Sequence, residues 1–90
     1  MMYKVELIIL NKDGVRDPEG ETLKRYVIDS TMPGKVADVR VGKIVVVTME
    51  ASSREEAEDL TRRLAESKRL YNPIVHKIVV RAERVEDGSN

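Results

Sequence analysis

Few side chains in this 90-residue sequence are suited to chemistry. There is one histidine, His76, and no cysteine, so a metal site built from nitrogen and sulphur ligands is unavailable. A serine nucleophile needs a base within hydrogen-bond reach. His76, the only histidine that could serve, lies between Val75 and Ile78 in a predicted strand. We therefore expect no catalytic, metal-binding or cofactor-binding residue in this chain.

Acidic and glycine residues do not change this expectation. The carboxylates between residues 55 and 59 follow a solvated helix face. The glycines at 14, 20, 34 and 42 form neither a dinucleotide fingerprint nor a phosphate loop. A sheet that binds RNA presents aromatic side chains for stacking, whereas this chain has three Tyr and no Phe or Trp.

The charge balance also limits the partners. Sixteen basic and sixteen acidic residues give a net charge of zero, so we expect neither a nucleic-acid nor a membrane partner. The longest apolar runs, Leu7–Leu10 and Ile44–Val47, are far shorter than the ~20 residues that span a bilayer. Lys4 and Glu6 interrupt the apolar segment that an export signal needs. We expect a cytoplasmic protein with one domain at 1–85 and a disordered tail at 86–90.

The joint Gly14–Gly20 connects the first predicted strand to the first predicted helix. Asp17 can cap the helix, and Pro18 suits its first position because the N–H that proline lacks would be unpaired there. Gly20 costs up to ~1 kcal/mol relative to Ala in a helix interior. It is either tolerated in the first turn or retained so that another backbone can approach closely.

The apolar patterns predict an α+β domain of the ferredoxin-like βαββαβ type, an antiparallel sheet with both helices on one face. Strands are expected at 2–10, 35–41, 43–50 and 74–85, the middle two forming a hairpin around Gly42. Helices are expected at 18–31 and between Ser53 and Asn72. Their predicted buried stripes are Leu23, Tyr26 and Val27 in the first helix and Ala57, Leu60 and Leu64 in the second.

Two of these strands are apolar on both faces. If Leu7 and Val45 face the helices, Ile8, Ile44 and Val46 face away from them. A monomer would expose this apolar group to water, and such patches usually mark an interface. We therefore expect a homo-oligomer that forms through the open sheet face or by exchange of the terminal strand.

Three segments resemble the PurS family, the small subunit of phosphoribosylformylglycinamidine (FGAM) synthase. They are Gly14–Gly20, Val36–Lys43 and Asn72–Val75, in the family's order and spacing, in a chain that matches the family nearly end to end. Residues 30–34, Ser-Thr-Met-Pro-Gly, depart from the Leu-Gly-aromatic run that is usual in the family.

The resemblance implies an assembly subunit of an enzyme complex in purine biosynthesis. In that complex a glutaminase subunit releases ammonia, and a large synthetase subunit uses it, with ATP and Mg, to make formylglycinamidine ribonucleotide. The small subunit would bridge these two partners and assist ammonia transfer without catalytic residues or a cofactor of its own. It would form a homodimer or homotetramer. The motifs make Asp17, Gly20, Arg40 and Lys43 the candidates for partner contact, although Arg40 also fits a surface strand charge.

The residues leave two other functions open. A free-standing ferredoxin-like domain could sense a small metabolite at a dimer interface. An acylphosphatase-like hydrolase binds phosphate in the first strand–helix loop, but Asp13, Asp17 and Glu19 would repel an anion there and disfavour that activity.

Overall fold

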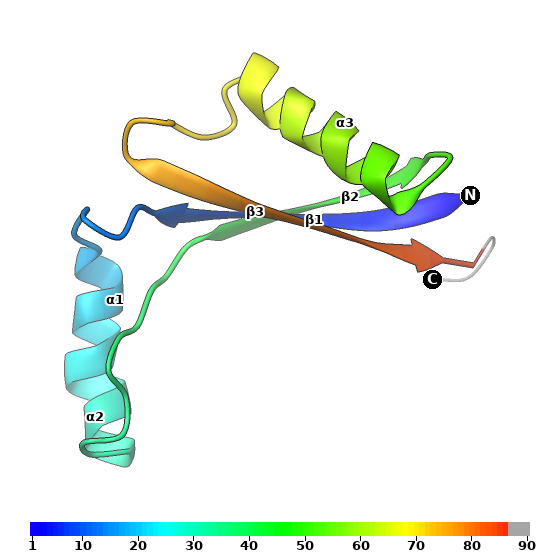
Figure 1. The fold of residues 1–90 in the computed structure, drawn as a ribbon. Coiled ribbons are helices and arrows are strands. Elements are labelled where there is room, and N and C mark those ends of the chain that lie inside the picture. Colours follow the sequence, from blue (N-terminus) through cyan, green and yellow to red (C-terminus); the bar gives the residue numbers. More distant parts are fainter. Residues whose placement is uncertain (87–90) are drawn as a thin grey trace.

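The computed structural model describes residues 1–86, so the expected tail lies almost entirely outside the described residues. Strands β1 (Met2–Asn11), β2 (Lys43–Glu50) and β3 (His76–Val85) form an antiparallel sheet in the order β2-β1-β3 (Figure 1). β1 lies between the other two strands, and its alternate side chains Tyr3, Val5, Leu7 and Ile9 are buried.

Helix α3 (Arg54–Ser67) covers one face of this sheet (Figure 1). Its N-terminus is capped by Ser53, whose hydroxyl accepts a hydrogen bond from the Glu56 N–H at 3.0 Å. The side chains under α3 alternate along β1, as a half-buried strand requires. The buried apolar residues of the chain are Tyr3, Val5, Leu7, Ile9, Ala51, Ala57, Ala65 and Ala82.

The predicted stripe of α3 is only partly correct. Ala57 is buried as expected, but Thr61 and Ala65 continue the buried line. These small side chains, spaced four residues apart, lie on one face of the helix and let it approach the sheet closely. Leu60 and Leu64 lie on the flank of α3 and remain exposed.

The first helical segment extends without a break over the predicted residues 18–31. It consists of α1 (Pro18–Leu23), the π-helical turn η1 (Lys24–Ile28) and α2 (Asp29–Thr31). From its end, residues 32–42, here called the strap, run back along the helices to β2 (Figure 1). Together, residues 18–42 form an arm that projects from one end of the sheet. The arm raises the radius of gyration to 16.3 Å, compared with about 12 Å for a compact chain of this length.

The α+β class and the antiparallel sheet are confirmed, but two details of the prediction are wrong. Residues 35–41 are not a strand, so the sheet has three strands, and only α3 covers its face. Common hairpin loops contain two or more residues, whereas Gly42 alone separates the two predicted strands. The chain therefore runs from the strap into β2 without reversing, and the strap packs against α1 instead of against β2 (Figure 1).

Within the described residues, none of the helices combines the length and the apolar character that crossing a membrane requires.

Candidate interaction site

Asp17 ties the two halves of the arm together at its root. Its carboxylate accepts hydrogen bonds from the backbone N–H of Gly20 at 3.0 Å and from that of Val41 at 2.7 Å. The first is the predicted N-cap bond, and Pro18 occupies the first helical turn as expected. The second connects residues 24 positions apart. One side chain therefore fixes the start of the helix and the end of the strap.

The surroundings of Asp17 favour its charged form. Asp17 is buried, with only 7% of its surface exposed. Hydrogen bonds from the N–H groups of Val41 and Gly20 lower the pKa of the Asp17 carboxyl. Burial acts in the opposite direction, and the charge of Arg40 lowers this pKa further. The group is therefore an anion at neutral pH, which strengthens both hydrogen bonds.

Gly20 lies where the helix and the strap approach each other most closely. A Cβ atom at this position would clash with the backbone carbonyl of Val39 and would lie 2.7 Å from an Asp17 carboxylate oxygen. The sequence predicted the close approach of a second backbone as one explanation for this glycine. That backbone belongs to the strap of the same chain.

Arg40 connects the strap to the loop that leaves β1. Its guanidinium donates hydrogen bonds to the carbonyl oxygens of Val15 at 3.0 Å and Asp13 at 3.3 Å. It also forms an ion pair with Asp38 at 3.2 Å. The planar, five-donor guanidinium can serve all three acceptors, which an amine could not do with the same geometry. Asp17, Gly20 and Arg40 thus form one cluster, here called the latch.

Lys43 is not part of the latch. It begins β2, lies opposite Ile9 in the sheet and is exposed. The structure therefore gives three of the four candidate residues a role within the chain and leaves Lys43 on the surface. Contact of these four residues with a partner stays a prediction.

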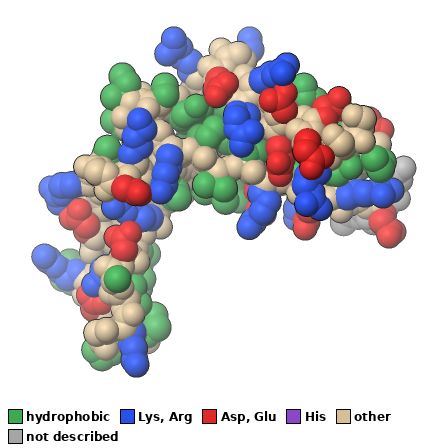
Figure 2. All heavy atoms as spheres, in the orientation of Figure 1, with side chains coloured by type: hydrophobic (Ala, Val, Ile, Leu, Met, Phe, Trp, Pro, Cys, Tyr) green, Lys and Arg blue, Asp and Glu red, His purple; other side chains and the backbone are tan. Residues whose placement is uncertain are grey.

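The sequence predicted the apolar stripe of the arm but not its exposure. Tyr26 is 68% and Val27 53% exposed, and Leu23 is also at the surface. Figure 2 shows hydrophobic side chains along the arm. The 3.6-residue periodicity is the same whether the stripe is covered by the chain itself or by a partner. The sequence therefore contains the apolar stripe, but whether the chain buries this stripe depends on the position of the arm in the fold.

A second apolar surface lies on the sheet face opposite α3. Ile44 and Val46 are each 52% exposed there, and Val79 of β3 is also exposed. Their neighbour on β1 is Ile8, which pairs with Ile44 and Val79. This is the open-face patch that the two-faced strands predicted.

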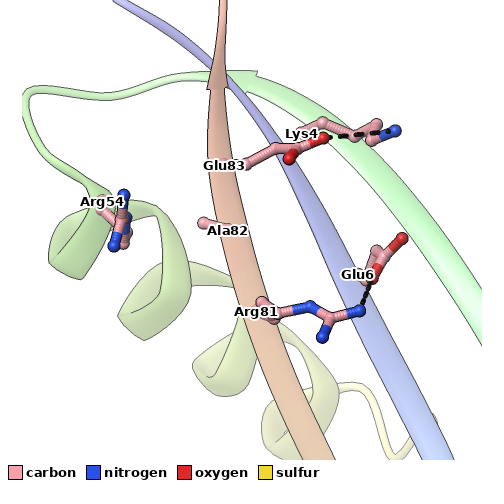
Figure 3. A pocket seen from close by; sticks show the side chains of 6 residues that line it. All are labelled: Lys4, Glu6, Arg54, Arg81, Ala82 and Glu83. Atoms are coloured by element: carbon pink, nitrogen blue, oxygen red, sulfur yellow. Dashed lines mark hydrogen bonds and ion pairs between the residues drawn. The ribbon is translucent and has the colours of Figure 1, made fainter.

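The other end of this face is charged (Figure 3). Lys4 pairs with Glu83 at 3.6 Å, and Arg81 pairs with Glu6 at 2.7 Å. The hydrogen bond from Arg81 lowers the pKa of Glu6. These side chains line a shallow hollow with Arg54 and Ala82. Four of the five charged groups in this hollow are paired with each other.

The described residues show little that could perform catalysis. The Nδ1 atom of His76 accepts a hydrogen bond from the backbone N–H of Asn72 at 3.0 Å, and this bond fixes the turn before β3. No group of three or more His, Asp or Glu side chains within residues 1–86 is arranged to hold a metal ion.

Comparison with known proteins gives a consistent family. The sequence profile of PurS, described as phosphoribosylformylglycinamidine (FGAM) synthase, matches residues 4–84. The PurS subunit from Methanocaldococcus jannaschii is 32% identical over 89 residues, covering 94% of this chain and 100% of the relative. The PurS subunit from Archaeoglobus fulgidus is 46% identical over 70 residues, covering 73% and 80%.

Solved structures agree with the sequence relatives. The PurS subunit from Thermotoga maritima has a TM-score of 0.75 at 30% identity, covering 92% of this chain and 93% of that one. A chain of the PurLQS structure from the same organism gives a TM-score of 0.74 at 30% identity, covering 92% and 99%. The profile match over residues 4–84 and the 32% identity to a relative that is covered over its full length show that this chain belongs to the PurS family.

Proposed function

We propose that this chain is the small PurS subunit of FGAM synthase and acts in purine biosynthesis, in the cytoplasm. The match of the PurS profile to residues 4–84 carries the proposal. The similar Thermotoga maritima chain belongs to a structure of PurLQS, which supports an assembly with two further subunits.

In this role the chain bridges a glutaminase and an ATP-dependent synthetase and assists ammonia transfer between them. The reaction's Mg, ATP and glutamine are bound by those partners. The latch is consistent with such a role, because Asp17, Gly20 and Arg40 hold an exposed arm in a defined direction. Lys43 lies where the arm meets the sheet and is available to a partner.

The chain also self-associates in this proposal, as a homodimer or homotetramer. The open-face patch supports this, since Ile44, Val46 and Val79 are exposed together. Contiguous apolar patches of this kind on a small domain usually mark an interface.

Reconstitution tests the proposal. The purified chain is added to the glutaminase and synthetase subunits of its own organism, and formylglycinamidine ribonucleotide is measured with glutamine or with ammonium chloride as the nitrogen source. We expect glutamine-dependent synthesis only when the chain is present, and ammonia-dependent synthesis without it. Glutamine-dependent synthesis that is equally fast without the chain would refute the proposed role.

A further inference from the structure

The turn that precedes β3 is held by several hydrogen bonds. The Asn72 carbonyl accepts the N–H groups of Val75 at 3.1 Å and His76 at 2.7 Å. The side-chain oxygen of Asn72 accepts the N–H of Ile74 at 3.0 Å, and the Nδ1 atom of His76 accepts the N–H of Asn72 at 3.0 Å. The carbonyl of Val75 accepts the N–H of Lys12 at 2.9 Å, which ties the turn to the loop that follows β1. The backbone of this turn is therefore well fixed.

The fixed turn holds Ile74 away from the rest of the chain. Ile74 is 79% exposed, the largest value among the large apolar side chains of residues 1–86. Pro73, which precedes it, has a locked φ angle, and the β-branched side chain of Ile74 has few rotamers. A side chain that is already ordered loses little conformational entropy when it binds. Ile74 therefore has the properties of a preorganised apolar anchor.

The end of α3 that leads into this turn has an unusual backbone. The Leu70 N–H donates to the Ala65 carbonyl at 2.9 Å, which is the closing hydrogen bond of a Schellman motif. The residue before Leu70 in such a motif is usually glycine, because its φ angle is positive. Here it is Arg69, with a φ of 52°. Glycine would end the helix without strain, so the helix end alone does not explain an arginine, and strained positions are concentrated at functional sites.

The loop between α3 and β3, residues 68–75 and here called the α3–β3 loop, is also positively charged. Residues 67–77 contain Lys68, Arg69 and Lys77 but no Asp or Glu. Lys77 pairs with Asp13 at 2.8 Å. Lys68 and Arg69 are exposed and form no salt bridge within residues 1–86. The carbonyl end of α3 stabilises these two cations without neutralising them.

We propose that the α3–β3 loop is a docking surface for a partner subunit of the complex. Ile74 fills an apolar pocket of that subunit, and Lys68 and Arg69 face carboxylates at the rim of the pocket. This inference rests on the proposed function, and it assigns a contact surface separate from the latch, from Lys43 and from the open-face patch. The loop lies at the end of the sheet from which the arm projects (Figure 1).

A different protein suits this loop better than a second copy of the chain. A two-fold contact brings the same patch of both copies together. Two copies that met loop to loop would therefore oppose Lys68 and Arg69 of one copy to those of the other, and like charges across an interface are unfavourable. An apolar pocket with Asp or Glu at its rim matches the loop in polarity and in charge. An apolar centre with a polar rim is the usual composition of protein interfaces.

Two variants of the loop test the docking surface. Ile74→Ser removes the anchor, and Arg69→Gly removes a cation while it relieves the strain of the positive φ angle. The glutaminase and synthetase subunits are held at constant concentration, and this chain is titrated into them. The measured quantity is the concentration of the chain that gives half-maximal glutamine-dependent synthesis, at low and at high salt. The controls are Ile74→Val, which stays apolar, and Arg54→Ala, which removes a cation from the opposite end of α3.

We expect Ile74→Ser to raise the half-maximal concentration roughly tenfold, because truncating an apolar anchor commonly weakens binding by such a factor or more. Arg69→Gly should raise it by a smaller factor at low salt and leave it unchanged at high salt, because salt screens exposed charges. The same variant should keep or raise the urea midpoint of the chain, which a purely structural role of Arg69 would not predict. Both controls should match the wild type.

The outcomes separate this inference from the proposed function. If the wild type supports glutamine-dependent synthesis and both loop variants match it, the docking surface is overturned while the proposed function stands. If Ile74→Ser lowers the urea midpoint or changes the oligomeric state in sedimentation, Ile74 stabilises the fold or lies between copies, and the docking surface is likewise overturned. A wild-type chain that gives no glutamine-dependent synthesis overturns both.

Discussion

The sheet under α3 and the arm are built by the same chain but held together by different forces. Under α3, Val5 and Leu7 are fully buried, and apolar contact with Ala57 and Ala65 stabilises the unit. In the arm, polar bonds at the root replace an apolar core, and Gly20 is the only buried residue of its helices. The sheet can therefore fold by burying its own side chains, whereas the arm is held in place by the latch and its apolar side stays exposed.

The largest expected effect is in the sheet. Leu7→Ala removes a fully buried side chain from the central strand, and such changes cost about 2–5 kcal/mol. Urea unfolding should show this loss as a lower midpoint with an unchanged slope. The control is Val46→Ala on the open face, which should cost less in the monomeric chain because Val46 is half exposed. Equal losses for the two variants would show that the open face is buried in solution.

A glycine comparison tests the packing of the arm. Gly20→Ala places a methyl group against the Val39 carbonyl and Asp17, and overpacking of this kind costs typically about 1–3 kcal/mol. Gly14→Ala is the matched control, because a Cβ at Gly14 meets no atom within 4 Å. Amide hydrogen exchange should become faster across residues 18–41 in the first variant and stay slow in β1. Loss of protection throughout the sheet would mean that the arm and the sheet unfold together.

The contrast between the two regions also explains which parts of the fold could be predicted. The strand at residues 43–50 and the helical segment at 18–31 follow from local periodicity, and the Asp17 cap follows from adjacent residues. Residues 35–41 alternate like a strand, but their neighbours in space decide their structure. A single sequence does not show that the Val41 N–H is bonded to Asp17.

The sequence singles out each residue of the latch separately, but it does not predict that the three residues form one cluster. Gly20 and Arg40 stand out in the sequence because each is more specific than its predicted element needs. Their contacts join positions far apart in the chain, 25 residues apart for Arg40 and Val15. Local patterns carry no information on such pairs, so the sequence did not show that Gly20 and Arg40 contact distant parts of their own chain.

Acid should weaken the root of the arm. Because the pKa of Asp17 is lowered in the folded chain, its stabilising bonds are complete above about pH 4 and are lost as the pH falls through the lowered pKa. Asp17→Asn keeps the cap but replaces one accepting oxygen by an amide nitrogen, which should lower the free energy of unfolding at pH 7. The stability difference from the wild type should shrink toward pH 3. A stability difference that is equally large at pH 3 and at pH 7 would show that the charge of Asp17 does not stabilise the arm.

The smallest effect on stability is expected at Arg40, and it links the latch to function. Arg40→Ala removes hydrogen bonds to Val15 and Asp13 at a partly exposed site, which should cost about 1 kcal/mol or less. Its effect on the reconstituted enzyme should be larger, because a loosened strap no longer presents the arm in one direction. Glutamine-dependent synthesis should fall while ammonia-dependent synthesis stays unchanged. Asp38→Ala removes only the exposed ion pair with Arg40 and is the control. If Arg40→Ala unfolds the sheet, Arg40 stabilises the whole fold; if both variants retain full glutamine-dependent synthesis, the direction of the arm does not matter for the complex.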